Sequence, residues 1–426
     1  MNALLFVSSA LGLMLLGVPV SFSLGAASLC YLLIQGIPPI SFAQQLAGGI
    51  DSYTLLALPF FILAGQLMNL GGITRKIFRF ANSIVGHIRG GLAHANIIAS
   101  MIFASISGSA TASAGALGMI QLRAMEENKY SREFSVGLIS AAMTIGPVIP
   151  PSVIMVVYGI SAGVSIGELF IGGIIPGILM GIGLMLMVVW RSTRKGGLPR
   201  YHDRFTFKEV RASFLDAIIA LIAPLIVIGG IAGGVFTATE AGAVAAAYAF
   251  VVGRFWYKEL TFRDLWRSFV ETMGMSASIL LIMGMSTSFG WILAFEQAPA
   301  MIAAWLLSVS ENPNIVLLLL MVMYFILGCF LEAIAIVVMT IPVVMPVITQ
   351  LGIDPVHFGV LVAVNMSIGT ITPPLGIAMY VMTDIARISM QTFARAIAPF
   401  MIPLLGSLIL ITLVPGLVTF LPYAMR

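Results

Sequence analysis

The sequence predicts an all-α polytopic membrane protein built from two inverted repeats, each holding a re-entrant hairpin and a broken helix. Three observations carry this prediction. Long stretches of the chain carry no charge, a glycine- and proline-rich phrase occurs twice, and nearly all basic residues gather in a few short loops.

The composition is that of a chain whose main solvent is lipid. Hydrophobic residues make up 60% of it and charged residues 9%, with a mean hydropathy of +1.07. The uncharged stretches are 1–50, 90–122, 134–167 and 396–425. A helix needs about 20 apolar residues to cross a bilayer, so each stretch is long enough to cross or re-enter. A transmembrane β-barrel would instead show segments of about 10 alternating residues.

The repeated phrase marks two interrupted helices. Residues 143–152 read MTIGPVIPPS and residues 366–375 read MSIGTITPPL, so that Gly146 and Gly369 lie 223 positions apart. Proline removes a backbone donor and glycine adds backbone freedom, and both interrupt helices. A single proline would suffice for a kink. Two broken helices at matching places in two halves of a membrane protein are typical of transporter binding sites.

The repeat extends beyond this phrase. At the same offset of 223, residues 105–109 lie over residues 328–332, and residues 17–25 resemble residues 234–242 at an offset of 217. The chain therefore divides into units 1–190 and 212–426, joined by a basic cytoplasmic linker, 191–211.

The charges orient the two units. All but three of the 21 Lys and Arg residues fall within 75–89, 123–132, 191–211 and 254–267, and short basic loops stay in the cytoplasm. The segment 90–122 has basic loops on both sides, so it begins and ends inside. Its counterpart, 312–352, is flanked by Glu311 and Asp354 and is placed outside. Like segments of opposite polarity are what an inverted repeat requires.

Each unit then contains the same succession of segments. In the first we expect scaffold spans within 1–70, an arm at 71–89, a hairpin at 90–122, a broken span at 133–163 and a span at 167–190. In the second we expect scaffold spans within 213–287, an arm at 290–308, a hairpin at 312–352, a broken span at 356–386 and a span at 392–422. Residues 1–35 should divide into two short spans near Gly17.

The breaks and hairpin tips are the candidate binding residues. Interrupted helices leave carbonyl oxygens free, which suit a hard cation such as Na⁺, and half-helix N-termini attract a carboxylate. The expected sodium ligands are Ser105, Ser107, Gly146, Ile149, Gly328, Gly369 and Thr372. The expected substrate contacts are Ser109, Thr111, Pro150, Pro151, Pro373 and Pro374. The serine-rich first tip could alternatively be a small-residue packing face.

Other polar residues favour structural roles. Glu332, beside the second tip, could pair with a cation, but helix capping is preferred because a carboxylate would repel an anion. Asp384 and Arg387 are spaced as a helical ion pair, and Thr237 with Glu240 fits a capping box.

Several function classes are disfavoured. No phosphate-binding Walker A sequence is present, so the chain itself should not hydrolyse ATP. No nucleophile–base arrangement stands out, and we expect no enzyme. The two cysteines and four histidines are scattered and predict no metal centre. The net charge of +4 is explained by the cytoplasmic loops, so it does not indicate nucleic-acid binding.

The motifs resemble those of the large membrane subunit of tripartite ATP-independent periplasmic (TRAP) transporters. The matching stretches are LPFFILAG at 58–65, SGSATA at 107–112, IGPVIPPS at 145–152, SIGELFIGGIIPG at 165–177, TATE at 237–240 and the second Pro-Pro loop. The resemblance covers essentially the whole chain. One departure is Ser113, where the family's pattern holds an acidic residue.

The resemblance implies a sodium-driven importer with an elevator-type transporter fold and an elevator mechanism, in the bacterial inner membrane. It implies two protein partners, a small four-helix membrane subunit and a periplasmic substrate-binding protein. The substrate would be an organic anion such as a C4-dicarboxylate or sialic acid, with Na⁺ as coupling ion and no use of ATP.

Three alternatives are weaker. A stand-alone divalent-anion/sodium symporter has a similar architecture but carries Ser-Asn-Thr at both hairpin tips, a sequence that is absent here. A channel would not accumulate its substrate uphill. A membrane scaffold protein would have no use for two matched broken helices.

Overall fold

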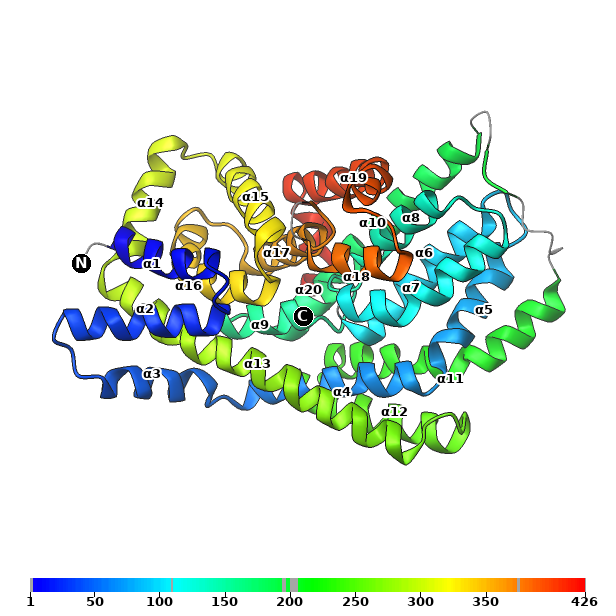
Figure 1. Cartoon of the computed structure of the whole chain (residues 1–426), viewed down its shortest axis with the longest axis horizontal. Coiled ribbons are helices and arrows are strands. Elements are labelled where there is room, and N and C mark those ends of the chain that lie inside the picture. Colours follow the sequence, from blue (N-terminus) through cyan, green and yellow to red (C-terminus); the bar gives the residue numbers. More distant parts are fainter. Residues whose placement is uncertain (1–2, 109, 194–196, 200–205, 374–375, 426) are drawn as a thin grey trace.

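The computed structural model describes residues 3–108, 110–193, 197–199, 206–373 and 376–425, and every regular element within them is helical. Seven of these helices are long and apolar enough to cross a membrane, and further apolar helices are shorter. Figure 1 shows the helices crossing one another around a centre formed by α9, α10, α17 and α18. The predicted all-α membrane fold class is confirmed.

The helices of the first unit follow the expected succession. The scaffold contains α1 Ala3–Leu15, α2 Val20–Ile34, α3 Ile40–Ile50, a 3₁₀ turn Tyr53–Leu56 and α4 Ala57–Leu70. The arm is α5 Ile73–Val85, and hairpin 1 is α6 Gly91–Ser107 with α7 Ala110–Glu127. The broken span is α8 Arg132–Met143 with α9 Val153–Ala162, followed by α10 Ile166–Thr193.

The second unit repeats this order. Its scaffold contains α11 Phe207–Ala232, α12 Ala238–Val251, a π-helical turn Val252–Trp256 and α13 Phe262–Phe295. The arm is α14 Ala298–Val309, and hairpin 2 is α15 Pro313–Phe330 with α16 Ala333–Gln350. The broken span is α17 Pro355–Gly369 with α18 Ile377–Ala386, followed by α19 Met390–Leu413 and α20 Gly416–Ala424.

Three boundaries differ from the expected ranges. The scaffold helix α13 runs on to Phe295, inside the range 290–308 given to the second arm, so α14 is the shorter element. The stretch before the first arm is divided at Asp51 into α3 and α4, whereas its counterpart α13 is continuous. The last span, expected at 392–422, ends at Leu413, and Pro415 opens the separate helix α20.

The central helices of each unit pack on helices of the other unit. The broken half-helix α9 packs on α16 of the other unit, and α18 packs on α7. In the same way α8 packs on α19 while α17 packs on α10. Each hairpin also packs on the broken helix of its own unit, hairpin 1 on α8 and hairpin 2 on α17, and one continuous apolar core joins both units.

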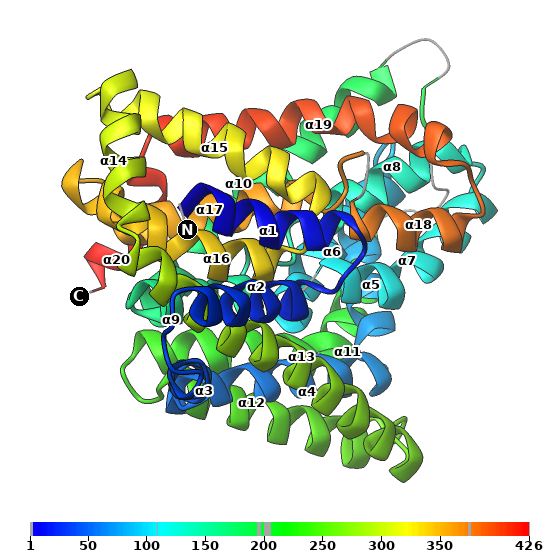
Figure 2. The ribbon, with the colours of Figure 1, turned by 60° about the vertical axis from the view of Figure 1, so that its left-hand side comes forward.

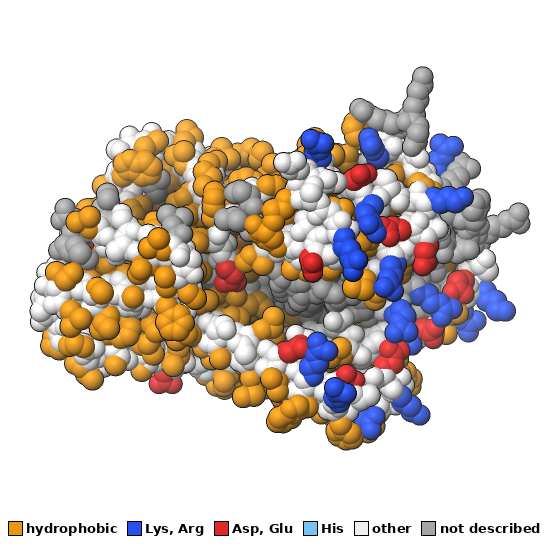
Figure 3. All heavy atoms as spheres, viewed as in Figure 1, with side chains coloured by type: hydrophobic (Ala, Val, Ile, Leu, Met, Phe, Trp, Pro, Cys, Tyr) orange, Lys and Arg blue, Asp and Glu red, His pale blue; other side chains and the backbone are white. Residues whose placement is uncertain are grey.

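The scaffold lies to one side of this core. Figure 2 shows α3, α4, α12 and α13 along one side, with α15, α18 and α19 on the other. Within the scaffold, α4 packs on α12 and α2 packs on α13, again across the two units. A second cluster of buried residues joins α4, α5, α6, α11 and α12. Figure 3 shows Lys and Arg gathered at the end where α5, α8 and α11 lie, while the opposite end is largely hydrophobic.

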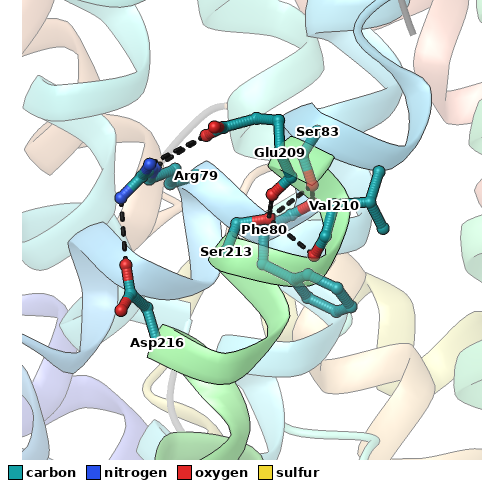
Figure 4. A network of polar contacts seen from close by, with 7 residues as sticks. All are labelled: Arg79, Phe80, Ser83, Glu209, Val210, Ser213 and Asp216. Carbon is teal, nitrogen blue, oxygen red and sulfur yellow. Dashed lines mark hydrogen bonds and ion pairs between the residues drawn. The ribbon is translucent and has the colours of Figure 1, made fainter. Parts of the chain in front are cut away.

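The first arm is fixed to the scaffold by polar contacts (Figure 4). Arg79 binds Glu209 and Asp216 of α11 at 2.9 and 3.0 Å, and Ser83 Oγ lies 2.8 Å from Ser213 Oγ. Ser213 also donates to the carbonyl of Glu209. The second arm, α14, carries no charged residue, so the two arms are held by different forces.

The loop before the first broken helix binds part of the linker. Tyr130 donates its hydroxyl to the carbonyl of Pro199, and the same carbonyl accepts the N–H of Gly90 at the base of hairpin 1. Burial raises the pKa of Tyr130 to about 12, so it remains a hydrogen-bond donor at neutral pH. Leu198 and Pro199 are thereby attached to hairpin 1 rather than to the scaffold.

These contacts give a prediction about Arg79 and Ser213. The ion pairs of Arg79 are half-exposed, with 53% of its side chain accessible, so Arg79→Ala should cost below about 1 kcal/mol and the loss should fade in salt. Ser213 is fully buried, and Ser213→Ala should cost about 1 kcal/mol regardless of salt. Thermal unfolding of the purified protein at low and high NaCl measures both. A loss for Arg79→Ala that is unchanged in high salt would contradict this account.

Candidate ion and substrate site

The two broken helices are interrupted at the same places. In the first, α8 ends at Met143 and α9 begins at Val153, and in the second, α17 ends at Gly369 and α18 begins at Ile377. At the end of each preceding helix a hydroxyl bonds back to a carbonyl: Thr144 donates to Ala141 O at 2.7 Å, and Ser367 donates to Val364 O at 2.8 Å. These two residues are 223 positions apart.

The first break is packed against α10. Ile149 places its side chain on Gly177, and the carbonyl of Val148 lies against Gly173; an added Cβ at either glycine would come within 2.3 Å of these atoms. Because the Ile149 side chain faces α10, only its backbone carbonyl is left for an ion. Beyond the cis Pro150–Pro151 bond, Ser152 caps α9 by accepting the N–H of Met155.

The tip of hairpin 1 touches this break. Gly108 adopts a φ of +61°, and an added Cβ there would lie 2.5 Å from the carbonyl oxygen of Pro151. Only glycine combines this left-handed conformation with so close an approach. Gly108 was not among the expected ligands, and its contact brings the first tip to Pro151.

The tip of hairpin 2 touches the second break through two glycines. A Cβ on Gly369 would lie 2.9 Å from both Cα and C of Gly328, so the two backbones are in direct contact. Thr372 is partly exposed, and its hydroxyl donates to Ile368 O at 2.8 Å. The hydroxyl oxygen therefore keeps its lone pairs for another ligand.

The remaining expected residues divide into two groups. Gly146 is buried, and its N–H bonds to Met143 O, but no described contact joins it to the first tip. Pro150 and Pro151 are buried, and Pro373 is exposed. Ser109 and Pro374 lie outside the described residues, as do the side chains of Ser105, Ser107 and Thr111. Their proposed roles as ligands remain predictions.

Four helices, α7, α9, α16 and α18, begin at a tip or a break, and they pack as the pairs α9–α16 and α7–α18. Helix N-termini carry partial positive charge, which favours an anion. In α18 the N–H groups of Ala378 and Met379 are already bonded to Thr370 O. Within 103–112, 144–152, 328–335 and 370–376 the only charged residue is Glu332. It occupies the N-cap position of α16, as expected, with the N–H groups of Ile334 and Ala335 facing its carboxylate.

Two further expectations had different outcomes. Thr237 and Glu240 form the predicted capping box at the start of α12. The expected ion pair between Asp384 and Arg387 is not formed, because Arg387 ends α18 in a left-handed conformation with a φ of +48°.

Sequence reasoning missed Gly173 and Gly177, although their spacing of four is the pattern of close helix packing in membranes.

The comparisons with known proteins give a consistent family assignment. The profile of the family "Tripartite ATP-independent periplasmic transporter, DctM component" matches residues 7–417. The chain is 44% identical to the sialic acid TRAP transporter large permease protein SiaM of Vibrio cholerae, over 97% of this chain and 96% of that protein. It is 35% identical to the C4-dicarboxylate TRAP transporter large permease protein DctM of Rhodobacter capsulatus, over 99% of both.

Two further similarities concern a longer protein and a solved structure. The sialic acid TRAP transporter permease protein SiaT of Haemophilus influenzae is 40% identical over 96% of this chain, which spans 66% of that protein. The crystal structure of the Alcanivorax borkumensis YdaH transporter superimposes with a TM-score of 0.62 over 97% of this chain and 98% of that one. At 17% identity this likeness concerns the fold, and it supports the predicted elevator-type transporter fold with its two inverted repeats.

The contact between Gly328 and Gly369 gives a second prediction. Gly369→Ala places a methyl group where the second tip now lies, which should cost about 1–3 kcal/mol and part the tip from the break. The adjacent Cys329 is buried, so its labelling by a maleimide should become several-fold faster. The measurement uses a Cys30→Ser background, because Cys30 is the exposed cysteine.

The matched control is Gly406→Ala, a glycine inside α19 with open space around its Cα. This change should leave the labelling rate of Cys329 unaltered and keep or slightly raise stability. Equal labelling rates in the Gly369 and Gly406 variants would show that the glycine contact does not hold the tip.

Proposed function

This chain belongs to the family of DctM components, the large permease subunits of TRAP transporters, and from that premise we propose that it couples the import of an organic anion to Na⁺. It is a multi-pass protein of the bacterial inner membrane. The observation that carries the proposal is the backbone contact between Gly328 at the second hairpin tip and Gly369 at the second break.

This contact favours a site for a small hard cation. With no side chain on either glycine, carbonyl groups of the tip and of the break can lie side by side, and Thr372 adds a hydroxyl at the same place. Non-helical backbone at membrane depth is tolerated where it lines a protein cavity, and unwound carbonyls coordinate Na⁺ in transporters. The first tip meets its own break at Gly108 and Pro151, which supports a second, related site.

The substrate proposal rests on charge. Four helices begin at a tip or a break and no Lys or Arg lies at either tip or break, so an anion would be held by backbone N–H groups rather than by an ion pair. Glu332 disfavours an anion beside α16, and the first N–H groups of α18 are bonded to Thr370 O, so the carboxylate is better placed near the N-terminus of α7. The 44% identical relative is named for sialic acid, which makes sialic acid the first substrate to test and a C4-dicarboxylate the second.

The packing also supports an elevator mechanism, in which hairpins and broken helices move together against the scaffold. Each hairpin packs on the broken helix of the opposite unit, so the two hairpins and the two broken helices form one body. The first arm is held to α11 by Arg79 and Ser83, which suits a fixed support. A small four-helix membrane subunit and a periplasmic binding protein complete the proposed system.

Reconstituted uptake tests the coupling. Proteoliposomes that hold this chain and its small membrane subunit should accumulate sialic acid only with the soluble binding protein outside and an inward Na⁺ gradient. Uptake without Na⁺ would refute the coupling. Sodium-driven uptake without the binding protein would instead identify a stand-alone symporter, and failure to accumulate above the outside concentration would identify a passive facilitator.

Side-chain ligands have their own test. Thr372→Ala and Ser107→Ala should each raise the Na⁺ concentration for half-maximal uptake by about tenfold, the effect of losing about 1.4 kcal/mol of binding. Thr419→Ala is the control, because Thr419 lies exposed on α20 with its hydroxyl bonded to Pro415 O. Wild-type Na⁺ activation in both variants would remove the hydroxyls from the site and leave only carbonyl ligands.

A further inference from the structure

The interior of hairpin 1 contains polar side chains that the transport site does not use. Asn96 and Ser100 lie one turn apart on α6, and Gln121 faces them from α7. Asn96 and Gln121 are fully buried, and Ser100 is 4% exposed. These residues lie below the tip, between the two helices and near the basic end of the molecule.

Most of the hydrogen-bonding capacity of this cluster is unmet. Gln121 Nε2 donates weakly to Asn96 O at 3.4 Å and to Ser100 Oγ at 3.3 Å. Asn96 Oδ1, Asn96 Nδ2 and Gln121 Oε1 have no hydrogen-bond partner among the described residues. If the side-chain amide of Gln121 were rotated by 180°, its oxygen would face the backbone carbonyl oxygen of Asn96. Its nitrogen would then be the atom without a partner.

A buried polar atom without a hydrogen-bond partner lowers the stability of the folded protein. An unsatisfied buried polar group costs about 1–3 kcal/mol, and in folded proteins the large majority of buried side-chain polar atoms have a partner. Three orphaned atoms on two facing side chains therefore indicate a ligand between α6 and α7.

The atoms themselves decide the chemistry of that ligand. Asn96 Nδ2 is a donor, while Asn96 Oδ1 and Gln121 Oε1 are acceptors. A cation would satisfy the oxygens but repel the amide N–H groups. The antiparallel dipoles of α6 and α7 largely cancel, so the interior favours neither sign of charge. A small neutral molecule that both donates and accepts fits all three atoms.

We propose that hairpin 1 encloses a binding site for ordered water, lined by Asn96, Ser100 and Gln121. Buried waters typically make about three hydrogen bonds to polar groups that have no other partner. The water would join α6 to α7 through a hydrated contact. This inference concerns the inside of one hairpin, so it stands whether or not the chain transports Na⁺.

Hairpin 2 shows that the fold does not require this site. At the offset of 223 the counterparts of Asn96, Ser100 and Gln121 are Leu319, Met323 and Val344. These three side chains carry no hydrogen-bonding group. The helices α15 and α16 are joined by a direct hydrogen bond between the hydroxyls of Tyr324 and Thr340, at 2.7 Å. The two hairpins are equivalent in topology but differ in their polar link, which is ordered water in hairpin 1 and a direct hydrogen bond in hairpin 2.

A density map of the purified protein at a resolution that shows water tests the site directly. The expected result is one or more peaks within hydrogen-bonding distance of Asn96 and Gln121 and none between Leu319 and Val344. Continuous packing without a peak would overturn the proposal. A peak with sodium-like short distances to oxygens only, lost when K⁺ replaces Na⁺, would overturn it in favour of a cation site.

Exchange variants give an independent test. Asn96→Leu or Gln121→Val alone leaves the facing group orphaned and should lower the unfolding temperature by several degrees. The triple variant Asn96→Leu, Ser100→Met, Gln121→Val, which copies hairpin 2, should recover at least part of that loss, because removing every polar partner together is nearly neutral. The matched control is Val344→Gln, at the buried counterpart of Gln121, which should destabilise hairpin 2. Single variants as stable as the wild type would contradict the water site.

Discussion

Backbone polar groups in a bilayer have no water to bond to, and the rest of this structure depends on that constraint. Both broken helices expose carbonyl and N–H groups at membrane depth, which is tolerable only where protein or a lined cavity covers them. Here glycines allow other segments to come close enough to cover these groups. Gly173 and Gly177 let α10 approach the first break, and Gly328 meets Gly369 at the second. These close approaches protect the backbone from lipid. They also leave no side chain between the carbonyl oxygens of the segments in contact.

The packing of the central helices follows from this need. Each tip contacts its own break, Gly108 at Pro151 and Gly328 at Gly369. Each hairpin packs on the broken helix of its own unit through α8 or α17, and also on a half-helix of the other unit, α9 on α16 and α18 on α7. The breaks are therefore covered from both units.

The sequence predicted the fold class and the places of both breaks because these leave local signals. The phrase around Gly146 and Gly369 recurs at a fixed offset, and glycine with paired proline interrupts a helix in any context. The end of α13 at Phe295 leaves no such signal, because its lipid-facing and buried residues are alike apolar and no charge marks the turn. The contacts of Gly108 with Pro151 and of Gly177 with Ile149 were also beyond reach, because they join segments distant in sequence. The hydroxyl ligands at the first tip remain predictions from residue type alone.

The two halves share a topology but not a chemistry. The first break offers the Ile149 carbonyl where the second adds the Thr372 hydroxyl, so two ions bound there would differ in affinity. The first arm is held by ion pairs and the second by apolar contact, because only the first lies at the basic end of the molecule. Inversion places equivalent segments at opposite membrane faces, where the surroundings differ. Chemical asymmetry is therefore the expected outcome for an inverted repeat in a membrane with two unlike sides. It also means that ligands should be assigned to each half from its own residues rather than copied from the other half.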